Sequence, residues 1–165
     1  MEEIVIREWE SGDSVEELTA LLHRAYAKWG ERGLLFTAVD QGNETTRDRL
    51  NGAINFVAVQ GRRLVGSISV YSGPKEHSPE YYARPGVWFF GQFAVEPSLQ
   101  GTGIGARLIV AAEQAAGEGG AAELACDTRM GAPELADYYQ RRGYSIVAEH
   151  HWDDGQDSHV LARTL

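Results

Sequence analysis

A glycine-rich turn that follows an apolar strand is the feature of this sequence that most constrains its fold. Residues 87–95 read Val-Trp-Phe-Phe-Gly-Gln-Phe-Ala-Val, which is expected of a strand covered on both faces. Pro97 ends the run, Gln100-Gly-Thr-Gly-Ile-Gly105 forms the turn, and an alanine-rich helix is predicted to about Gly117. Glycines let backbone N–H groups face outward, and a helix N-terminus adds partial positive charge. The turn is therefore suited to bind an anion such as a pyrophosphate, and its spacing is equally that of a plain tight turn between strand and helix.

Hydrophobic periodicity and turn residues predict the other elements around this unit. In chain order, they are a strand at 3–9, a helix after the Ser14/Glu17 capping signature, a helix from Asn43 to about Asn51, a hairpin of Ile54–Gln60 and Arg63–Tyr71, a loop at 72–86, a strand at Ala122–Cys126, a helix from Pro133 to Arg142 stopped by Gly143, and a hairpin of Tyr144–Trp152 and Ser158–Leu165. The order β-α-α-β-β-β-α-β-α-β-β predicts an α/β (α+β) fold with a mixed, mostly antiparallel sheet of about seven strands flanked by four helices.

Length, charge and cysteine content bound the class of protein. The chain has 165 residues, which fits one domain spanning residues 1–165. Its single cysteine, Cys126, excludes an intrachain disulfide framework and a cysteine-cluster metal site, so no metal is expected. The net charge of −9 argues against nucleic-acid or anionic-membrane partners. The chain has no apolar run of about 20 residues and no opening like a signal peptide, so we expect a cytoplasmic protein.

The glycine spacing alone leaves one alternative function open. Gly101, Gly103 and Ala106 also satisfy the loose dinucleotide fingerprint G-x-G-x-x-[G/A], and Asp127 follows the next strand about where a ribose ligand would lie. Against this alternative, four residues including Pro97 separate the strand from Gln100, and a predicted hairpin precedes that strand. A dinucleotide-binding domain would bind NAD.

Residues 87–144 resemble the core of the GNAT N-acetyltransferase superfamily. The matching parts are the strand that ends Phe93-Ala-Val95, the glycine turn, a helix, a strand, and the segment Tyr138-Tyr-Gln-Arg-Arg-Gly-Tyr144, which is similar to the aromatic–Tyr–x–x–x–Gly–aromatic ending of the family's last helix. The N-terminal helices and hairpin also follow the family's order, so the resemblance covers most of the chain. It implies a GNAT-like fold and an acetyltransferase.

The resemblance implies that acetyl-CoA is the cosubstrate. Its pyrophosphate would be held by main-chain N–H groups of the turn, and the corresponding residues are Gln100, Gly101, Gly103, Gly105 and Ala106. Arg107 would either add charge to a phosphate or be a solvated helix residue. The backbone of Phe93 and Val95 would pair with the pantetheine arm, and one N–H group of this strand would polarise the thioester carbonyl.

Tyr139 matches the family tyrosine that protonates the departing CoA thiolate. A phenol with a pKa near 10 is protonated at neutral pH and can act as a general acid. Tyr138 and Tyr144 are expected to pack in the core, and Cys126 is expected to be a buried structural thiol.

The sequence departs from the family pattern at three positions. Members often carry a Glu or His base at the positions of Phe89 or Gly91, and an asparagine at the position of Ala132. The proton acceptor would then be a water chain or a residue outside the motif. The candidates, each of which is also explained as a solvated surface group, are Glu76, His77, Glu80, His150, His151 and Asp153.

The resemblance places the acceptor opposite CoA, near the first two helices and the central loops. Aromatic residues are frequent there, namely Tyr26, Trp29, Phe36, Tyr71, Tyr81, Tyr82 and Trp88, as are the acids Glu31, Asp40, Glu44, Glu76 and Glu80. These acids predict a small-molecule or peptide amine acceptor, or they simply keep the surface soluble. The missing base leaves a second function open, that of a non-catalytic CoA-binding regulatory module. Homodimers are frequent in the family, so a homodimer is also open.

Overall fold

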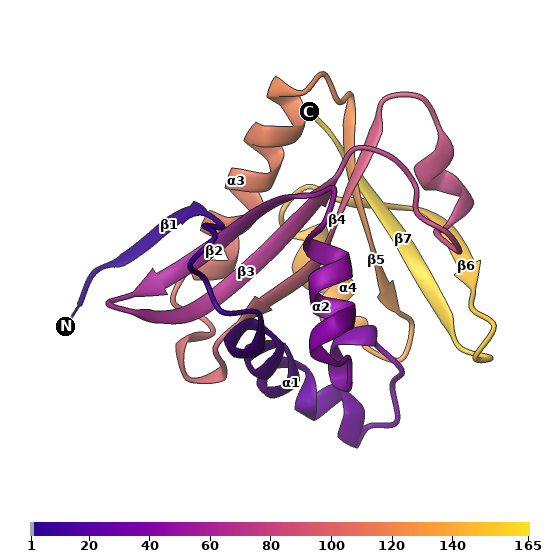
Figure 1. The fold of residues 1–165 in the computed structure, drawn as a ribbon. Coiled ribbons are helices and arrows are strands. Elements are labelled where there is room, and N and C mark those ends of the chain that lie inside the picture. The colour runs from indigo at the N-terminus through magenta and orange to yellow at the C-terminus, as the bar shows by residue number, and fades with distance from the viewer. Residues whose placement is uncertain (1) are drawn as a thin grey trace.

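The computed structural model describes residues 2–165, and in this part of the chain it contains one seven-stranded sheet flanked by four α-helices (Figure 1). The elements are β1 (Ile4–Glu8), α1 (Val15–Glu31), α2 (Asn43–Leu50), β2 (Ile54–Gln60), β3 (Arg63–Tyr71), β4 (Val87–Val95), α3 (Ile104–Glu118), β5 (Glu123–Arg129), α4 (Pro133–Gln140), β6 (Ser145–His151) and β7 (Asp157–Thr164). This sequence of elements confirms the predicted order.

The sheet is mixed, as predicted. Its strand order is β1-β2-β3-β4-β5-β7-β6, and every neighbouring pair is antiparallel except β4 and β5. One parallel pair in seven strands confirms the predicted fold class. It also contradicts the dinucleotide-binding alternative, because a doubly wound nucleotide-binding domain has a mostly parallel sheet.

Some element boundaries differ from the predicted ones. β5 continues to Arg129, three residues past the predicted end at Cys126, because residues 127–129 stay paired with β7. The capping signature forms only half of a capping box. The Glu17 N–H donates to Ser14 Oγ over 3.1 Å, but the Glu17 carboxylate accepts from the Leu64 N–H over 2.8 Å instead. α1 is thereby tied to the β2–β3 hairpin.

Helices cover both faces of the sheet and create two main cores. α3 and α4 pack on one face, where Ile104, Leu108 and Tyr139 join a buried cluster with the central strands. α1 packs on the other face and beside α2, around Leu18 and Leu22. Figure 1 shows α3 on the far side of the strands from α1 and α2. The helix that follows the glycine turn is therefore anchored against the centre of the sheet.

The pairing of β4 with β5 ends early, and this opens the sheet. Only Val87–Phe89 pair with Glu123–Ala125, and beyond this point the two strands diverge, as Figure 1 shows. β4 is also irregular at this position, because its register with β3 shifts between Ser67 and Ser69 and Gln92 has a φ of +45°. The second half of β4 therefore presents an unpaired edge toward the gap.

A buried polar network supports the irregular part of β4. Gln92 Oε1 accepts from Gln41 Nε2 over 2.8 Å, and the Gln92 carbonyl accepts from Ser67 Oγ over 2.7 Å. Gln41 Nε2 also donates to Thr46 Oγ1, while Gln41 Oε1 accepts from Arg49 Nη1 over 2.8 Å. Buried amides that satisfy each other in this way fix one geometry, because a lost partner leaves an unpaired polar group. The network thus fixes α2 and Arg49 relative to β4.

Candidate active site

A cavity of about 700 Å³ lies where the open edge of β4 meets the glycine turn and α3. Its lining includes seven of the residues predicted to hold the cosubstrate, namely Phe93, Val95, Gln100, Gly101, Gly103, Gly105 and Ala106. The splayed strand and the turn that were singled out in the sequence therefore form one continuous wall. We call this space the β4–α3 cavity.

Arg107 does not line the β4–α3 cavity. Its guanidinium donates instead to the Ile4 carbonyl over 3.0 Å, on the side of α3 that faces β1. Four other cations line the cavity and were not predicted, namely Lys28, Arg32, Arg141 and Arg142. These four cations lie in α1 or directly after α1 and α4, and only the tertiary structure brings them together.

Gly103 is the residue of the turn that most needs to be glycine. It caps the N-terminus of α3 with a φ of +92°, a conformation that costs an L-residue roughly 1–2 kcal/mol. A Cβ placed on it would meet no atom within 4 Å, so the backbone faces open space. The first N–H groups of α3 are therefore accessible to an anion in the cavity.

The backbone of β4 alternates between the sheet and the cavity. The Glu96 N–H, just past the end of β4, donates to Val65 of β3, whereas the carbonyls of Phe93 and Val95 face the opening. There the Phe93 carbonyl accepts from the Tyr26 hydroxyl over 2.7 Å, and the Val95 carbonyl accepts from Gln100 Nε2 over 3.2 Å. An extended ligand could pair with this edge by taking over these contacts.

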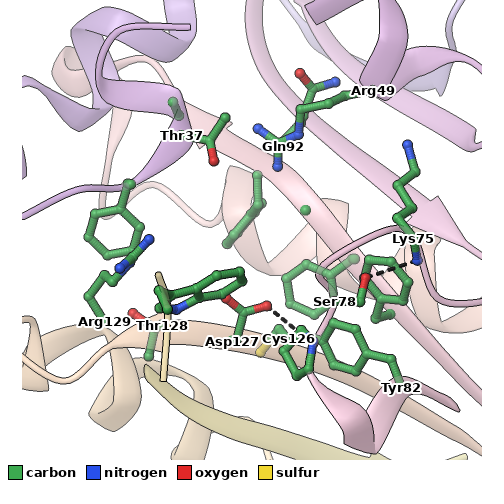
Figure 2. A pocket seen from close by; sticks show the side chains of 18 of the residues that line it. Thr37, Arg49, Lys75, Ser78, Tyr82, Gln92, Cys126, Asp127, Thr128 and Arg129 are labelled. Carbon is green, nitrogen blue, oxygen red and sulfur yellow. Dashed lines mark hydrogen bonds between the residues drawn. The ribbon is translucent and has the colours of Figure 1, made fainter. Parts of the chain in front are cut away.

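A second cavity, of about 430 Å³, lies on the other side of the gap between β4 and β5 (Figure 2). Four side chains line both cavities, namely Tyr26, Phe93, Leu135 and Tyr139. The two spaces therefore adjoin at these residues. We call the second space the Asp127 cavity, after the carboxylate in its wall.

Tyr139 is buried at the junction of the two cavities. Its ring packs edge-on against Phe90 and Tyr144, with centroid distances of 5.8 and 6.2 Å. Burial raises the pKa of its phenol well above the usual 10, so the group is protonated at any working pH. None of the hydrogen bonds formed among residues 2–165 uses this hydroxyl, whereas the Tyr26 hydroxyl is bound to Phe93. Tyr138, predicted to be core, is half-buried beside the β4–α3 cavity, where the Arg142 guanidinium lies 3.5 Å from its ring centroid.

Asp127 of β5 faces the second cavity, and its carboxylate accepts from the Tyr82 hydroxyl over 2.5 Å (Figure 2). Burial raises the pKa of Asp127, while the Tyr82 hydrogen bond and the charges of Arg129 and Arg49 act against this shift. Arg129 itself is neutralised by Asp154, at 3.0 Å. Sequence analysis placed Asp127 only in the dinucleotide alternative. The signal available in the sequence was its position directly after the predicted strand Ala122–Cys126.

The proton-acceptor candidates named from the sequence are mostly remote from this cavity. Glu76 and His77 are part of its lining, but their side chains are 89% and 74% exposed. Glu80, His150 and His151 lie in a separate surface pocket, and Asp153 lines neither cavity. Cys126 is buried, as predicted, and burial raises the pKa of its thiol.

Arg49 occupies the space beside Gly91, one of the two positions where members of the resembled family often carry a base. A Cβ on Gly91 would lie 3.0 Å from Arg49 Nη2. A guanidinium is always protonated in proteins and cannot accept a proton. The residue at this place is therefore a fixed cation, a feature that the apolar periodicity of α2 does not reveal.

The aromatic and acidic residues expected around the acceptor divide between several places. Tyr26, Phe36, Tyr71 and Tyr82 line the Asp127 cavity, Trp29 lines the β4–α3 cavity, and Tyr81 and Trp88 line neither. Of the five acids, only Glu76 is part of the Asp127 cavity lining. The acids predicted to attract a cation are therefore mostly outside the site.

Residues 2–165 contain neither a metal-binding cluster of side chains nor a membrane-spanning helix. No group of three or more His, Cys, Asp and Glu side chains is placed to hold a metal ion. No helix in the same range combines the length and apolar character needed to cross a membrane.

Comparison with known proteins identifies the family of this domain. The model of the acetyltransferase (GNAT) family matches residues 5–144. The chain belongs to the GNAT acetyltransferase family. Among curated protein sequences, none matches it significantly.

Solved structures share the fold at low sequence identity. A protein from Pyrococcus horikoshii OT3 is 20% identical with a TM-score of 0.78, over 99% of each chain. A GNAT acetyltransferase from Elizabethkingia anophelis with acetyl-CoA bound is 18% identical, with a TM-score of 0.71 over 98% of each chain. The ribosomal-protein-S18-alanine N-acetyltransferase of Escherichia coli is 16% identical, with a TM-score of 0.72 over 98% of this chain and 94% of its own.

The raised pKa of Asp127 predicts an effect on stability. The folded protein binds this proton more tightly than the unfolded chain, so the free energy of unfolding falls as pH rises from the ordinary carboxyl range through the folded-state pKa. Asp127→Asn, which keeps an acceptor for Tyr82, is expected to be more stable than the wild type at pH 7 and equal to it below about pH 4. Urea unfolding of both proteins across this range measures the difference. A variant that is less stable at pH 7 would contradict the prediction.

Proposed function

We propose that this protein is an N-acetyltransferase that transfers acetyl from acetyl-CoA to a primary amine, by direct attack in a ternary complex. The observation that carries the proposal is the meeting of two cavities at Tyr139. One cavity has an open strand edge and an anion-binding helix N-terminus. The other has a carboxylate and aromatic walls. A thioester that reaches the junction from the first cavity would meet an acceptor held in the second.

The β4–α3 cavity suits coenzyme A in three respects. The N–H groups at the start of α3 can donate hydrogen bonds to the pyrophosphate, the edge of β4 can pair with the amides of pantetheine, and Lys28, Arg141 and Arg142 can neutralise phosphate charge. Three solved neighbours carry acetyl-CoA or CoA according to their descriptions, which supports this assignment. Phe93 and Val95 are the strand residues assigned to pantetheine.

The reaction requires a neutral amine. The lone pair of the amine attacks the thioester carbon, and the carbonyl oxygen takes up negative charge, which an N–H group of β4 stabilises. The tetrahedral intermediate then collapses with cleavage of the C–S bond, and the nitrogen releases its remaining extra proton to water. Tyr139 gives its phenolic proton to the departing thiolate and is reprotonated from water. The products are the N-acetylated amine and CoA.

Asp127 is assigned as the proton acceptor for the amine. Among residues 2–165 that line the Asp127 cavity, it is the carboxylate that is both half-buried and free of an ion pair. A raised pKa makes a carboxylate a stronger base at neutral pH than an ordinary aspartate. Tyr82, which donates to it, would hold its orientation.

The names of two solved neighbours support an amine as the acceptor. One is a ribosomal-protein-S18-alanine N-acetyltransferase and another an aminoglycoside 6'-N-acetyltransferase, so this fold serves both protein and small-molecule acceptors. The second candidate is a CoA-binding regulatory module, motivated by the missing strand base. Release of CoA thiol with a panel of amines separates the two, because a regulatory module would bind CoA and release none.

Gly103→Val is expected to abolish CoA binding. The substitution forces a β-branched residue into a positive φ and places its side chain where the phosphate would lie. Isothermal titration with CoA measures the effect. Gly117→Ala, later in the same helix and also without a neighbour within 4 Å, should bind CoA as the wild type does. Normal binding by Gly103→Val would show that the turn does not hold the cosubstrate.

Tyr139→Phe is expected to lower kcat by about 10²-fold with little change in the affinity for CoA, because only the proton donor is removed. Steady-state thiol release and CoA titration check the two quantities. Tyr144→Phe is the matched control, since the Tyr144 hydroxyl is bound to Glu113 over 2.8 Å, outside both cavities. An unchanged kcat for Tyr139→Phe would exclude this phenol from the chemistry.

Asp127→Asn is expected to lower kcat/KM by roughly 10²- to 10⁴-fold at neutral pH. In the wild type, kcat/KM should rise with pH as Asp127 loses its proton, with an apparent pKa above that of an ordinary aspartate. This acid limb should be absent from the variant. A wild-type-like pH profile in Asp127→Asn would assign the proton acceptor elsewhere.

A further inference from the structure

The Asp127 cavity contains a cation without a partner. Arg49 lines it, and its guanidinium makes one hydrogen bond, from Nη1 to the amide oxygen of Gln41. No carboxylate among residues 2–165 lies within ion-pair distance of Arg49. Arg129, the other arginine of this cavity, is already neutralised by Asp154. Half-buried charge without a counter-ion is unfavourable, so Arg49 is set to receive an anion from outside the protein.

A second cation lies beside it. The Lys75 ammonium lies 4.3 Å from the ring centroid of Tyr71, and the Tyr71 hydroxyl donates to the Arg49 carbonyl over 2.7 Å. Partial burial and the charge of Arg49 lower the pKa of Lys75, against the opposing charge of Asp48. This means that the two cations repel each other in the free protein. An anion between them would remove that repulsion.

The cations and the carboxylate lie on different sides of the same cavity. Tyr71, Phe89 and Tyr82 form a stack, with centroid distances of 4.9 and 4.2 Å, that runs from Lys75 at one end to Asp127 at the other. Figure 2 shows Arg49 across the open space from Asp127. A ligand along this wall would thus meet positive charge at one end and negative charge at the other.

We propose that the acceptor carries an oxyanion as well as its amine, with the oxyanion bound by Arg49 and Lys75 and the amine directed toward Asp127. This inference rests on the proposed function and specifies its substrate class. A guanidinium binds carboxylate and phosphate-type groups through paired N–H donors, and it retains its charge at every working pH. Small amino carboxylates and aminoalkyl phosphonates share this chemistry and fit a cavity of about 430 Å³.

The cavity is expected to bind an acceptor of different charge from the one that composition suggests. The net charge of −9 and the surface acids suggested an amine acceptor that is attracted as a cation, yet four of the five acids named lie outside the cavity. Local charge decides which ligand a pocket binds, because exposed charges farther than about 10 Å away are screened by salt. Arg49 therefore matters more for selectivity than the net charge of the chain.

The test compares matched ligands and does not depend on turnover. Amino acids, aminoalkyl phosphonates and the corresponding plain amines, such as phenylalanine and phenethylamine, are titrated calorimetrically into the protein saturated with CoA. At least one class that carries an oxyanion should bind at least about 10-fold more tightly than its plain amine. Arg49→Gln should remove about 10²-fold of that affinity without weakening plain-amine binding, and Lys75→Met should remove about 3-fold. The two anionic arms identify which oxyanion is preferred.

Two controls make each outcome decisive. Arg47→Gln, in the same helix but exposed and outside the cavity, should behave as the wild type. Thermal unfolding and CoA titration should show that Arg49→Gln is folded and binds CoA. Equal binding of plain amines, or no binding of any oxyanion ligand, would overturn the inference. Selective binding of oxyanion ligands without thiol release would instead uphold it and contradict the proposed acetyl transfer.

Discussion

The loss of pairing between β4 and β5 after Phe89 is the constraint on which the site depends. A parallel pair that continued to the end of β4 would consume the N–H and C=O groups that face the gap and would close both cavities. The open edge requires support on its other side. Ser67 of β3 supports it there, and so does the buried amide of Gln41, which contacts Gln92. The polar core beneath β4 and the opening above it are therefore parts of one arrangement.

The junction of the cavities has a consequence for how the two phenols are used. Tyr26 and Tyr139 both lie there, but Tyr26 donates its hydrogen bond to the Phe93 carbonyl. Burial raises the pKa of Tyr26 to about 12, and the hydrogen bond fixes its ring beside the strand. Tyr139 keeps its donor for a ligand. One phenol therefore shapes the strand edge, while the other faces the sulfur that the proposed function places at the junction.

The sequence predicted the elements because their signals are local. The glycine turn and the stop at Gly143 depend on neighbouring residues, and both were found where expected. Arg107 could not be placed, because its direction depends on how α3 lies against β1. Asp127 and Arg49 come from segments far apart in sequence, and they share a cavity only because the strands diverge. Contacts between residues so far apart along the chain leave no periodic pattern in the sequence.

Gly91 and Arg49 have a consequence for the history of this site. A Cβ at position 91 would lie 3.0 Å from Arg49 Nη2, so a carboxylate or imidazole side chain there would crowd the guanidinium of an arginine at position 49. Acquiring one favours losing the other, and a single substitution at either place meets a clash or leaves a void. The two positions are thus expected to change together among relatives.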